Sequence, residues 1–287
     1  MKIIKSLSEL EEWVSHSYQR GLRIGLVPTM GALHEGHLSL VRRARKENDL
    51  VAVSIFVNPT QFNNPTDLET YPRDEERDFR LLAPEGTDMV FAPSVSEIYP
   101  SGAVREKIFD LGAAAEVMEG PRRPGHFQGV AQIVSRLFEL IRPHNAYFGE
   151  KDFQQIAVIR NMVASEKMDV NIIACPIRRA DDGLALSSRN ALLTPEQRAV
   201  APSIYRHLQQ GVDYSHSHGV SDTRAYVEEL INAEPEMKVE YFEIVDGRTL
   251  QPIEEWGETD YSVGCITVYC GKVRLIDNIA FRLPAER

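Results

Sequence analysis

Two long apolar runs near the start of the chain constrain its fold more than any other feature of the sequence. The runs "LRIGLV" (residues 22–27) and "LVAVSIFV" (residues 50–57) are separated by a segment typical of a helix, "LSLVRRARKEN". A nearly continuous apolar run is typical of a strand that is buried on both faces of a parallel sheet. Strand, helix and strand in succession form a βαβ unit, so the sequence predicts a parallel sheet covered by helices.

The same alternation continues along the chain. Further apolar runs predict strands, and apolar residues at helical spacing predict helices between them. The additional strands are expected at residues 88–92, 145–149 and 170–175, and the helices at residues 6–21, 126–142 and 152–167. Residues 1–180 are therefore expected to form one doubly wound α/β domain.

The pattern changes after residue 180. We expect a helix at residues 194–211, a polar loop at residues 211–221, and three strands joined by turns. The strands are expected at residues 239–246, 264–270 and 273–279. Residues 181–287 are thus predicted to form a smaller α+β C-terminal domain, which also carries the "LSSRN" loop.

The composition narrows the range of partners. The formal net charge of −10 argues against a large basic surface, so nucleic acid is not an expected partner. The start "MKIIKSLSELEEW" has no long apolar run, so neither a signal peptide nor a membrane span is expected there. Cys175, Cys265 and Cys270 form no CxxC pair, and we expect buried, reduced thiols. These features predict a cytoplasmic protein.

Two histidines three residues apart mark the first candidate site. His34 and His37 lie in "TMGALHEGHLSL", between a predicted strand and a predicted helix. Ligands bind beyond the carboxyl ends of parallel strands, and a helix N-terminus favours anions, so two imidazoles there can donate hydrogen bonds to a phosphate. Ordinary loop histidines and zinc ligands are the alternatives. Metalloprotease histidines stand four apart, however, and no third ligand motif is evident.

Three further polar segments are candidates for the same site. Lys151 in "GEKDFQQ" is either a phosphate-binding cation or half of a solvated ion pair, and Gln154 and Gln155 suit a hydroxy-acid substrate. "GLALSSRN" is either a polar loop or a mobile clamp over a triphosphate. "IFVNPTQFNNPTDLETYPRDEERD" is expected to be a long ordered loop or lid with Gln61 at its base. Neither GxxxxGK[ST] nor a GxGxxG after a strand is present, so a nucleotide must be held in another way.

In order and spacing, these motifs resemble the pantothenate synthetase family. The resemblance covers nearly the whole chain, and it rests on "PTMGALHEGH", "SIFVNPTQF", "YPR", "EIYP", "RPGHF", "FGEKDFQQ" and "LALSSRN". The HxGH motif alone marks a wider nucleotidylyltransferase superfamily. The resemblance implies a Rossmann-type N-terminal domain and a homodimer.

The resemblance also implies a reaction of the coenzyme A pathway. ATP and pantoate would give pantoyl adenylate and pyrophosphate, and β-alanine would then attack the acyl carbon to give pantothenate and AMP. Mg²⁺ is the implied cofactor, and ATP, pantoate and β-alanine are the implied partners, with no nucleic acid and no membrane. Two other hypotheses stay open: a nucleotidylyltransferase that keeps an adenylylated product, and a non-catalytic nucleotide-binding module.

Matching residues take their expected roles from the family. His34, His37, Lys151 and Arg189 would be catalytic, with both histidines on the ATP phosphates and His37 as a proton donor. Lys151 would lie on the phosphates, and Arg189 would be the cation of the loop that corresponds to the KMSKS loop of aminoacyl-tRNA synthetases. The residues expected to bind ATP are Met30, Gly31, Ala32, Leu33, His34, Glu35, Gly36, His37, Gly149, Glu150, Lys151, Asp152, Arg178, Leu186, Ser187, Ser188 and Arg189.

The substrate and metal sites follow from the same resemblance. Gln61 and Gln155 would bind pantoate and β-alanine, and Asp78 aligns with a magnesium position of the family. This chain departs from the family pattern at two places. Arg77 stands where some members have an acidic residue, and Gln128 stands where an arginine is frequent.

Overall fold

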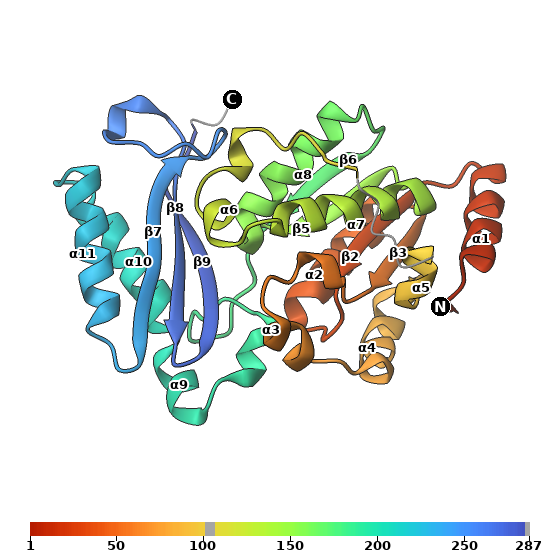
Figure 1. Ribbon diagram of the computed structural model, residues 1–287, viewed down its shortest axis with the longest axis horizontal. Coiled ribbons are helices and arrows are strands. Elements are labelled where there is room, and N and C mark those ends of the chain that lie inside the picture. The colour runs from red at the N-terminus through yellow and green to blue at the C-terminus, as the bar shows by residue number, and fades with distance from the viewer. Residues whose placement is uncertain (101–106, 285–287) are drawn as a thin grey trace.

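The computed structural model describes residues 1–100 and 107–284 and contains two β-sheets (Figure 1). The larger sheet is parallel, with six strands in the order β1 (Lys2–Ile4), β4 (Met89–Phe91), β3 (Leu50–Ile55), β2 (Ile24–Thr29), β5 (Asn145–Gly149) and β6 (Asn171–Cys175). The smaller sheet is antiparallel, in the order β7 (Met237–Asp246), β8 (Ser262–Cys270) and β9 (Val273–Arg282). The predicted doubly wound α/β class with a smaller α+β part is confirmed.

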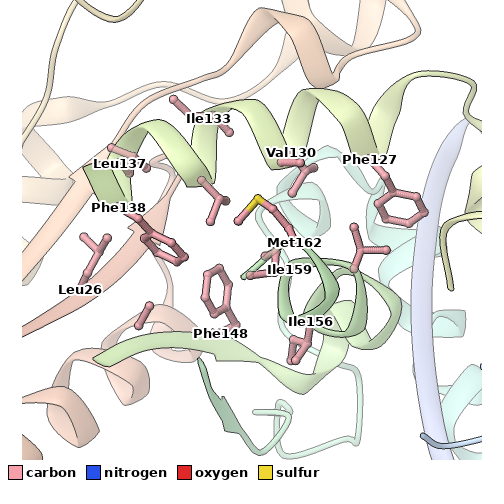
Figure 2. Packing of buried hydrophobic residues seen from close by; sticks show 14 of the residues in the cluster. Leu26, Phe127, Val130, Ile133, Leu137, Phe138, Phe148, Ile156, Ile159 and Met162 are labelled. Atoms are coloured by element: carbon pink, nitrogen blue, oxygen red, sulfur yellow. The ribbon is translucent and has the colours of Figure 1, made fainter. Parts of the chain in front are cut away.

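Helices cover both faces of the parallel sheet. The helices of this part of the chain are α1 (Leu7–Gln19), α2 (Glu35–Glu47), α3 (Pro65–Thr70), α4 (Glu75–Leu82), α5 (Val95–Ile98), α6 (Glu119–Arg122), α7 (His126–Ile141) and α8 (Phe153–Ser165). Successive side chains of a strand point to opposite faces, so Leu26 and Val27 of β2 enter different cores. Leu26 packs with Phe148 of β5 against α7 and α8, as Figure 2 shows, and Val27 packs in the core that contains Val41 of α2.

The small sheet has its own helices, α9 (Pro195–Val200), α10 (Ser203–Tyr214) and α11 (Val220–Asn232). Figure 1 shows α10 and α11 beside β7, on the side away from the parallel sheet. Ile204 and Leu208 of α10 and Val227 of α11 pack against Phe242 of β7 in this second core. An amphipathic helix pair thus covers one face of the antiparallel sheet.

Three segments differ from the expectations. The helix expected at residues 194–211 is divided at Pro202, because proline lacks the N–H that a continuous helix needs. The helix α11 was not predicted, and part of the expected loop at residues 211–221 belongs to α10. The lid contains α3, α4 and the 3₁₀ helix η1 (Pro59–Gln61), so it is largely helical.

The two parts of the chain pack closely together. The core beneath α7 and α8 also contains Tyr241 and Val245 of β7 and Val263 of β8. Each sheet lies wholly on one side of residue 180. The domain division at residue 180 stays a prediction, because one core extends across it.

Two expectations from composition can be compared with the structure. Cys175, Cys265 and Cys270 are buried and form no disulfide, which confirms the expected reduced thiols. Within residues 1–100 and 107–284, every helix is too short or too polar to cross a bilayer.

Candidate active site

The candidate site lies where the order of the parallel strands reverses. β2 pairs with β3 on one side and with β5 on the other. Ligands of doubly wound folds bind beyond the carboxyl ends of the strands at such a switch point. The segments that follow β2 and β5 line a cavity of about 210 Å³ at this place.

His34 and His37 lie at the start of α2, which begins within the HxGH motif and not after it as expected. His34 is the N-cap residue, and its Nδ1 accepts a hydrogen bond from the Gly36 backbone N–H at 3.1 Å. The Nδ1 of His37 accepts from the His34 N–H at 3.3 Å. Each ring must therefore carry its proton on Nε2. Among the described residues neither Nε2–H has a partner, so each ring can donate to a ligand in the cavity.

Both imidazoles are neutral near pH 7. Burial, together with the charge of Lys151, lowers the pKa of His34 to about 4. Burial also lowers the pKa of His37 well below its ordinary value, and His34 and Lys151 add to this effect. The ring centroids lie only 4.1 Å apart, so two charged rings would repel each other strongly. The pair offers phosphate two neutral N–H donors.

Gly36 makes this arrangement possible. A Cβ at residue 36 would lie 2.8 Å from Nδ1 and Cε1 of His34. Any larger residue would therefore push the His34 ring away from the backbone N–H that it caps. The middle glycine of HxGH is required by the packing of the first histidine.

A buried carboxylate fixes the turn that precedes His34. Asp78 of α4 accepts hydrogen bonds from the backbone N–H groups of Ala32 and Leu33, both at 2.8 Å. Its side chain is only 1% exposed. Ala32 has a φ of +50°, which non-glycine residues rarely adopt, and Arg77 donates to the Leu33 carbonyl at 3.0 Å. α4 thus holds the turn that carries the histidines.

Lys151 enters the cavity from the other strand. It lies in the 3₁₀ helix η5 (Glu150–Asp152), directly after β5. Asn278 of β9 donates from Nδ2 to the carbonyl oxygens of Glu150 at 2.8 Å and Lys151 at 3.1 Å. The small sheet therefore fixes the backbone of Lys151. Sequence patterns did not reveal this role of Asn278, because a single asparagine in a strand has no recognisable pattern.

The LSSRN loop lies against both the lid and the histidine turn. Its 3₁₀ helix η6 (Ser188–Leu192) begins with Ser188, whose Oγ donates to the Ala32 carbonyl at 3.0 Å. Arg189 pairs with Asp67 of α3, with Nη2 and Oδ2 2.9 Å apart. The guanidinium carbon also lies 5.9 Å from the ring centroid of Tyr71, which lines the cavity. The loop and the lid are joined by this ion pair.

Gln61 and Gln155 line the cavity from opposite sides of the switch point. The Gln61 amide lies between Met30 Sδ and Asn58 Nδ2, each at 3.3 Å. Gln154, expected to suit a hydroxy acid, is turned away from the cavity. Its side chain is buried and bonds to the backbone of residues 114, 117 and 119. Of the pair, only Gln155 therefore lines this cavity.

Most of the residues expected at the site line this one cavity. Those that line it are Met30, His34, Gly36, His37, Gln61, Gly149, Lys151, Asp152, Gln155, Arg178, Leu186, Ser187, Ser188 and Arg189. Those that do not line it are Gly31, Ala32, Leu33, Glu35, Asp78 and Glu150. Leu33 is buried in the core, and Glu35 pairs with Arg42 at the surface. The expected contacts of Gly31, Ala32, Leu33, Glu35 and Glu150 with ATP stay predictions. Gln128, the departure noted above, bonds to the backbone of Phe109 and does not line this cavity.

The acidic residues near the cavity differ in their capacity to hold Mg²⁺. Within the described ranges, no cluster of three His, Cys, Asp or Glu side chains could hold a metal. Mg²⁺ usually keeps several waters and binds through one or two carboxylates together with substrate phosphates. Asp152 lines the cavity and suits that mode. Asp78 is buried, does not line the cavity and accepts one backbone hydrogen bond on each oxygen, so its expected role as a Mg²⁺ ligand stays a prediction.

The chain matches known proteins over almost its full length. A model of the family described as pantoate-beta-alanine ligase matches residues 2–280. A pantothenate synthetase of Porphyromonas gingivalis (strain ATCC BAA-308 / W83) is 56% identical, over 98% of this chain and 99% of that protein. A pantothenate synthetase of Moorella thermoacetica is 46% identical, over 99% of each chain.

Solved structures resemble this one in the same way. A pantothenate synthetase from Thermus thermophilus has a TM-score of 0.91 and 42% identity, over 99% of this chain and 100% of that chain. A pantoate-beta-alanine ligase from Francisella tularensis, complexed with beta-gamma ATP and beta-alanine, has a TM-score of 0.82 and 37% identity, over 98% of each chain.

Proposed function

The chain belongs to the pantoate-beta-alanine ligase family, and from this membership we propose how its cavity carries out the reaction. It is an ATP-dependent ligase that condenses pantoate with β-alanine to pantothenate, through pantoyl adenylate, and releases pyrophosphate and AMP. One observation carries the proposed mechanism: two neutral imidazoles, two cations and two amides converge on one cavity at the switch point of the sheet.

In the first step, the pantoate carboxylate attacks the α-phosphorus of ATP. The bond from that phosphorus to the bridging oxygen breaks, and pyrophosphate leaves with the electron pair. This displacement needs positioning and charge neutralisation more than a protein nucleophile. His34 and His37 donate from Nε2 to phosphate oxygens whose charge grows, and Lys151 and Arg189 neutralise that charge. Gln61 and Gln155 hold pantoate beside the α-phosphate.

Arg189 must change partners to reach a triphosphate. Its guanidinium pairs with the Asp67 carboxylate of the lid, and phosphate oxygens compete for the same donors. The lid and the LSSRN loop close over the cavity from two sides. An acyl adenylate hydrolyses readily, so this cover would keep water away from the intermediate.

In the second step, the neutral amine of β-alanine attacks the acyl carbon of pantoyl adenylate. A C–N bond forms, the bond from the acyl carbon to the phosphate oxygen breaks, and AMP leaves with the electron pair. One proton of the amine passes to solvent. The charge on the leaving phosphate is already present in the adenylate, so this step depends less on Lys151 than the first step does.

Four finer points are also proposals. Mg²⁺ would neutralise phosphate charge, held by Asp152 and the ATP phosphates. A homodimer rests on the family resemblance alone. A cytoplasmic location is supported by three buried, reduced thiols, which are typical of reducing compartments. A domain boundary near residue 180 is supported by the positions of the two sheets.

The order of the two steps can be tested directly. ATP, Mg²⁺ and pantoate alone should release one equivalent of pyrophosphate per active site, and adding β-alanine should then yield pantothenate and AMP. Lys151→Ala should slow the first half-reaction strongly and the attack on preformed adenylate less. Rapid-quench measurement of each half-reaction separates the two effects. An enzyme that releases no pyrophosphate before β-alanine arrives, or that retains an adenylylated final product, would contradict the mechanism.

A further inference from the structure

A buried carboxylate lies beside Lys151 and has no role in the steps above. Asp277 of β9 is only 5% exposed. Two small cavities, of about 50 Å³ and 10 Å³, are each lined by both Asp277 and Lys151. The next residue, Asn278, donates to the Lys151 carbonyl at 3.1 Å. Among the described residues, no carboxylate lies within 4 Å of the Lys151 ammonium, although Asp277 is its neighbour in both cavities.

Arg179 occupies both oxygens of Asp277. Its Nη1 donates to Oδ2 at 2.6 Å and its Nη2 to Oδ1 at 2.8 Å. The Asn278 backbone N–H also donates to Oδ1, at 2.8 Å. All three contacts are N–H donors, so Asp277 accepts on both oxygens, as an ionised carboxylate does. This two-pronged geometry is the strongest in which arginine binds a carboxylate.

Arg179 is itself held on its other side. Its guanidinium carbon lies 3.6 Å from the ring centroid of Tyr205 in α10, and its Nη1 donates to the Gly183 carbonyl at 3.2 Å. Arg179 lines neither the main cavity nor the two small ones. It is therefore not placed to touch a substrate there, and any effect on the reaction must pass through another residue.

The charges around Asp277 identify that residue. Burial raises the pKa of Asp277, whereas the hydrogen bonds and charge of Arg179, and more weakly the charge of Lys151, lower it. Without Arg179, the carboxylate would keep only the Asn278 N–H, and a buried, poorly paired charge is costly. The Lys151 ammonium is the other cation that acts on it, and its flexible stem would let it turn toward Asp277.

We propose that Arg179 is a positioning residue that occupies Asp277 and thereby keeps Lys151 free to meet the ATP phosphates. This inference rests on the proposed function, since it takes Lys151 as a phosphate-binding cation. The competing role is mechanical. Arg179 forms an antiparallel bridge with Ala185, in the segment that leads to the LSSRN loop, so its ion pair could serve only to anchor that segment.

The first test measures pyrophosphate release from ATP and pantoate. Arg179→Met should slow it by roughly tenfold or more, because Asp277 then competes with phosphate for Lys151. Adding Asp277→Asn removes the competitor, so the double variant should return to within about threefold of the wild-type rate. Arg179→Lys should also stay close to the wild type, since one ammonium suffices to balance the carboxylate. A mechanical anchor would need the guanidinium fork, and the double variant would then be no better than Arg179→Met.

The matched control is Arg198→Met. Arg198 binds Asp182 in the same segment at 2.6 Å, but both side chains are exposed, so this pair contributes little. The control should release pyrophosphate at the wild-type rate. Arg179→Gln, which is neutral but keeps a donor, gives the same measurement if Arg179→Met proves unstable, and melting temperatures show which variants are folded.

The second test follows Lys151 itself, without any substrate. Acetic anhydride modifies only neutral amines, and pairing with a carboxylate favours the protonated form. Acetylation of Lys151, measured by peptide mass spectrometry, should be roughly tenfold slower in Arg179→Met than in the wild type, and should recover in the double variant. The Arg198→Met control should be acetylated at the wild-type rate.

The two tests have separate meanings. Unchanged acetylation of Lys151 in Arg179→Met, or a double variant as impaired as Arg179→Met in both measurements, would overturn the proposal. Slower acetylation with normal pyrophosphate release would support the pairing of Asp277 with Lys151. It would at the same time contradict the proposed function, because Lys151 would then not act on the phosphates.

Discussion

His37 offers a neutral N–H donor to the cavity, so its loss should affect chemistry more than folding. His37→Ala is expected to slow pyrophosphate release from ATP and pantoate by roughly 10²-fold or more, since one preorganised donor contributes a few kcal/mol in the transition state. Rapid-quench assays measure this rate, and the melting temperature should change little. His16→Ala, on the exposed side of α1, provides the control. Near-normal turnover of the His37 variant would remove this histidine from the mechanism.

Asp78 should act through the histidine turn and not through a metal. Asp78→Asn replaces one acceptor by an N–H group, which must face the backbone N–H of Ala32 or Leu33. Hydrogen bonds to a charged group contribute about 1.5–3 kcal/mol, so we expect at least a roughly tenfold loss in the rate of adenylation. The concentration of Mg²⁺ that gives half-maximal activity should stay unchanged.

Glu76→Gln is the matched control for Asp78→Asn, because Glu76 lies on the same helix and is almost fully exposed. It should leave both the rate and the Mg²⁺ dependence as in the wild type. Recovery of the Asp78→Asn variant at high Mg²⁺ would show that Asp78 binds the metal after all.

Sequence motifs predict the reactive side chains but not the residues that hold them. His34, His37 and Lys151 can be recognised in the sequence because each follows the end of a predicted strand. Few other residue types bind phosphate at such a position. Asn278 supports the Lys151 backbone from another sheet, 127 positions away in the chain. Its role depends on how the two sheets pack, which no local pattern records.

At the scale of elements, α7 sets the position of Gln61, the residue proposed to bind pantoate. α7 packs directly against η1, and a Cβ on Gly129 would lie 2.5 Å from the Thr60 carbonyl oxygen and 2.8 Å from Gln61 Cα. Gly129→Ala should push η1 away from the helix. We expect a loss of stability of about 1–3 kcal/mol from overpacking, and a raised KM for pantoate with a smaller change in that for ATP.

Steady-state kinetics and urea denaturation check both effects of Gly129→Ala. Gly257→Ala is the control, because a Cβ there would meet no atom within 4 Å. A variant of Gly129 that loses stability but binds pantoate normally would show that α7 does not control Gln61.

Helices and strands were predicted correctly where the pattern of apolar residues was strong. Some were missed where apolar and polar residues are mixed. The buried strands β2, β3 and β5 were found from apolar runs alone. The helix α11 was missed although Val220, Val227 and Ile231 lie on its buried face at helical spacing, so the sequence did contain a signal for it. α7 was found, but its apolar stripe faces both the core and the active-site cavity. Periodicity cannot distinguish these two surroundings.

At the scale of the whole molecule, one buried carboxylate joins the two parts of the chain. Glu119 of α6 accepts hydrogen bonds from Arg274 of β9 and from Tyr241 of β7. Burial alone would raise the pKa of Glu119, but the hydrogen bonds and charge of Arg274 outweigh it and lower the pKa to about 2. Because the folded-state pKa lies below the ordinary value of 4.5, the group stabilises the fold above pH 4.5 and loses this effect as the pH falls toward 2.

Glu119→Gln should therefore weaken the attachment of the small sheet and remove part of the acid sensitivity. We expect a loss of about 3–5 kcal/mol at pH 7, since the change leaves Arg274 partly unpaired in a buried place. Wild-type protein should lose about 3 kcal/mol between pH 4.5 and 2 through this one group, and the variant should lack that contribution. Glu240→Gln is the matched control, because Glu240 binds the same Arg274 from within the small sheet. Urea denaturation at several pH values measures both quantities. If the Glu240 variant changed the pH dependence as much as the Glu119 variant, the acid-sensitive contact would lie within the small sheet and not between the two parts of the chain.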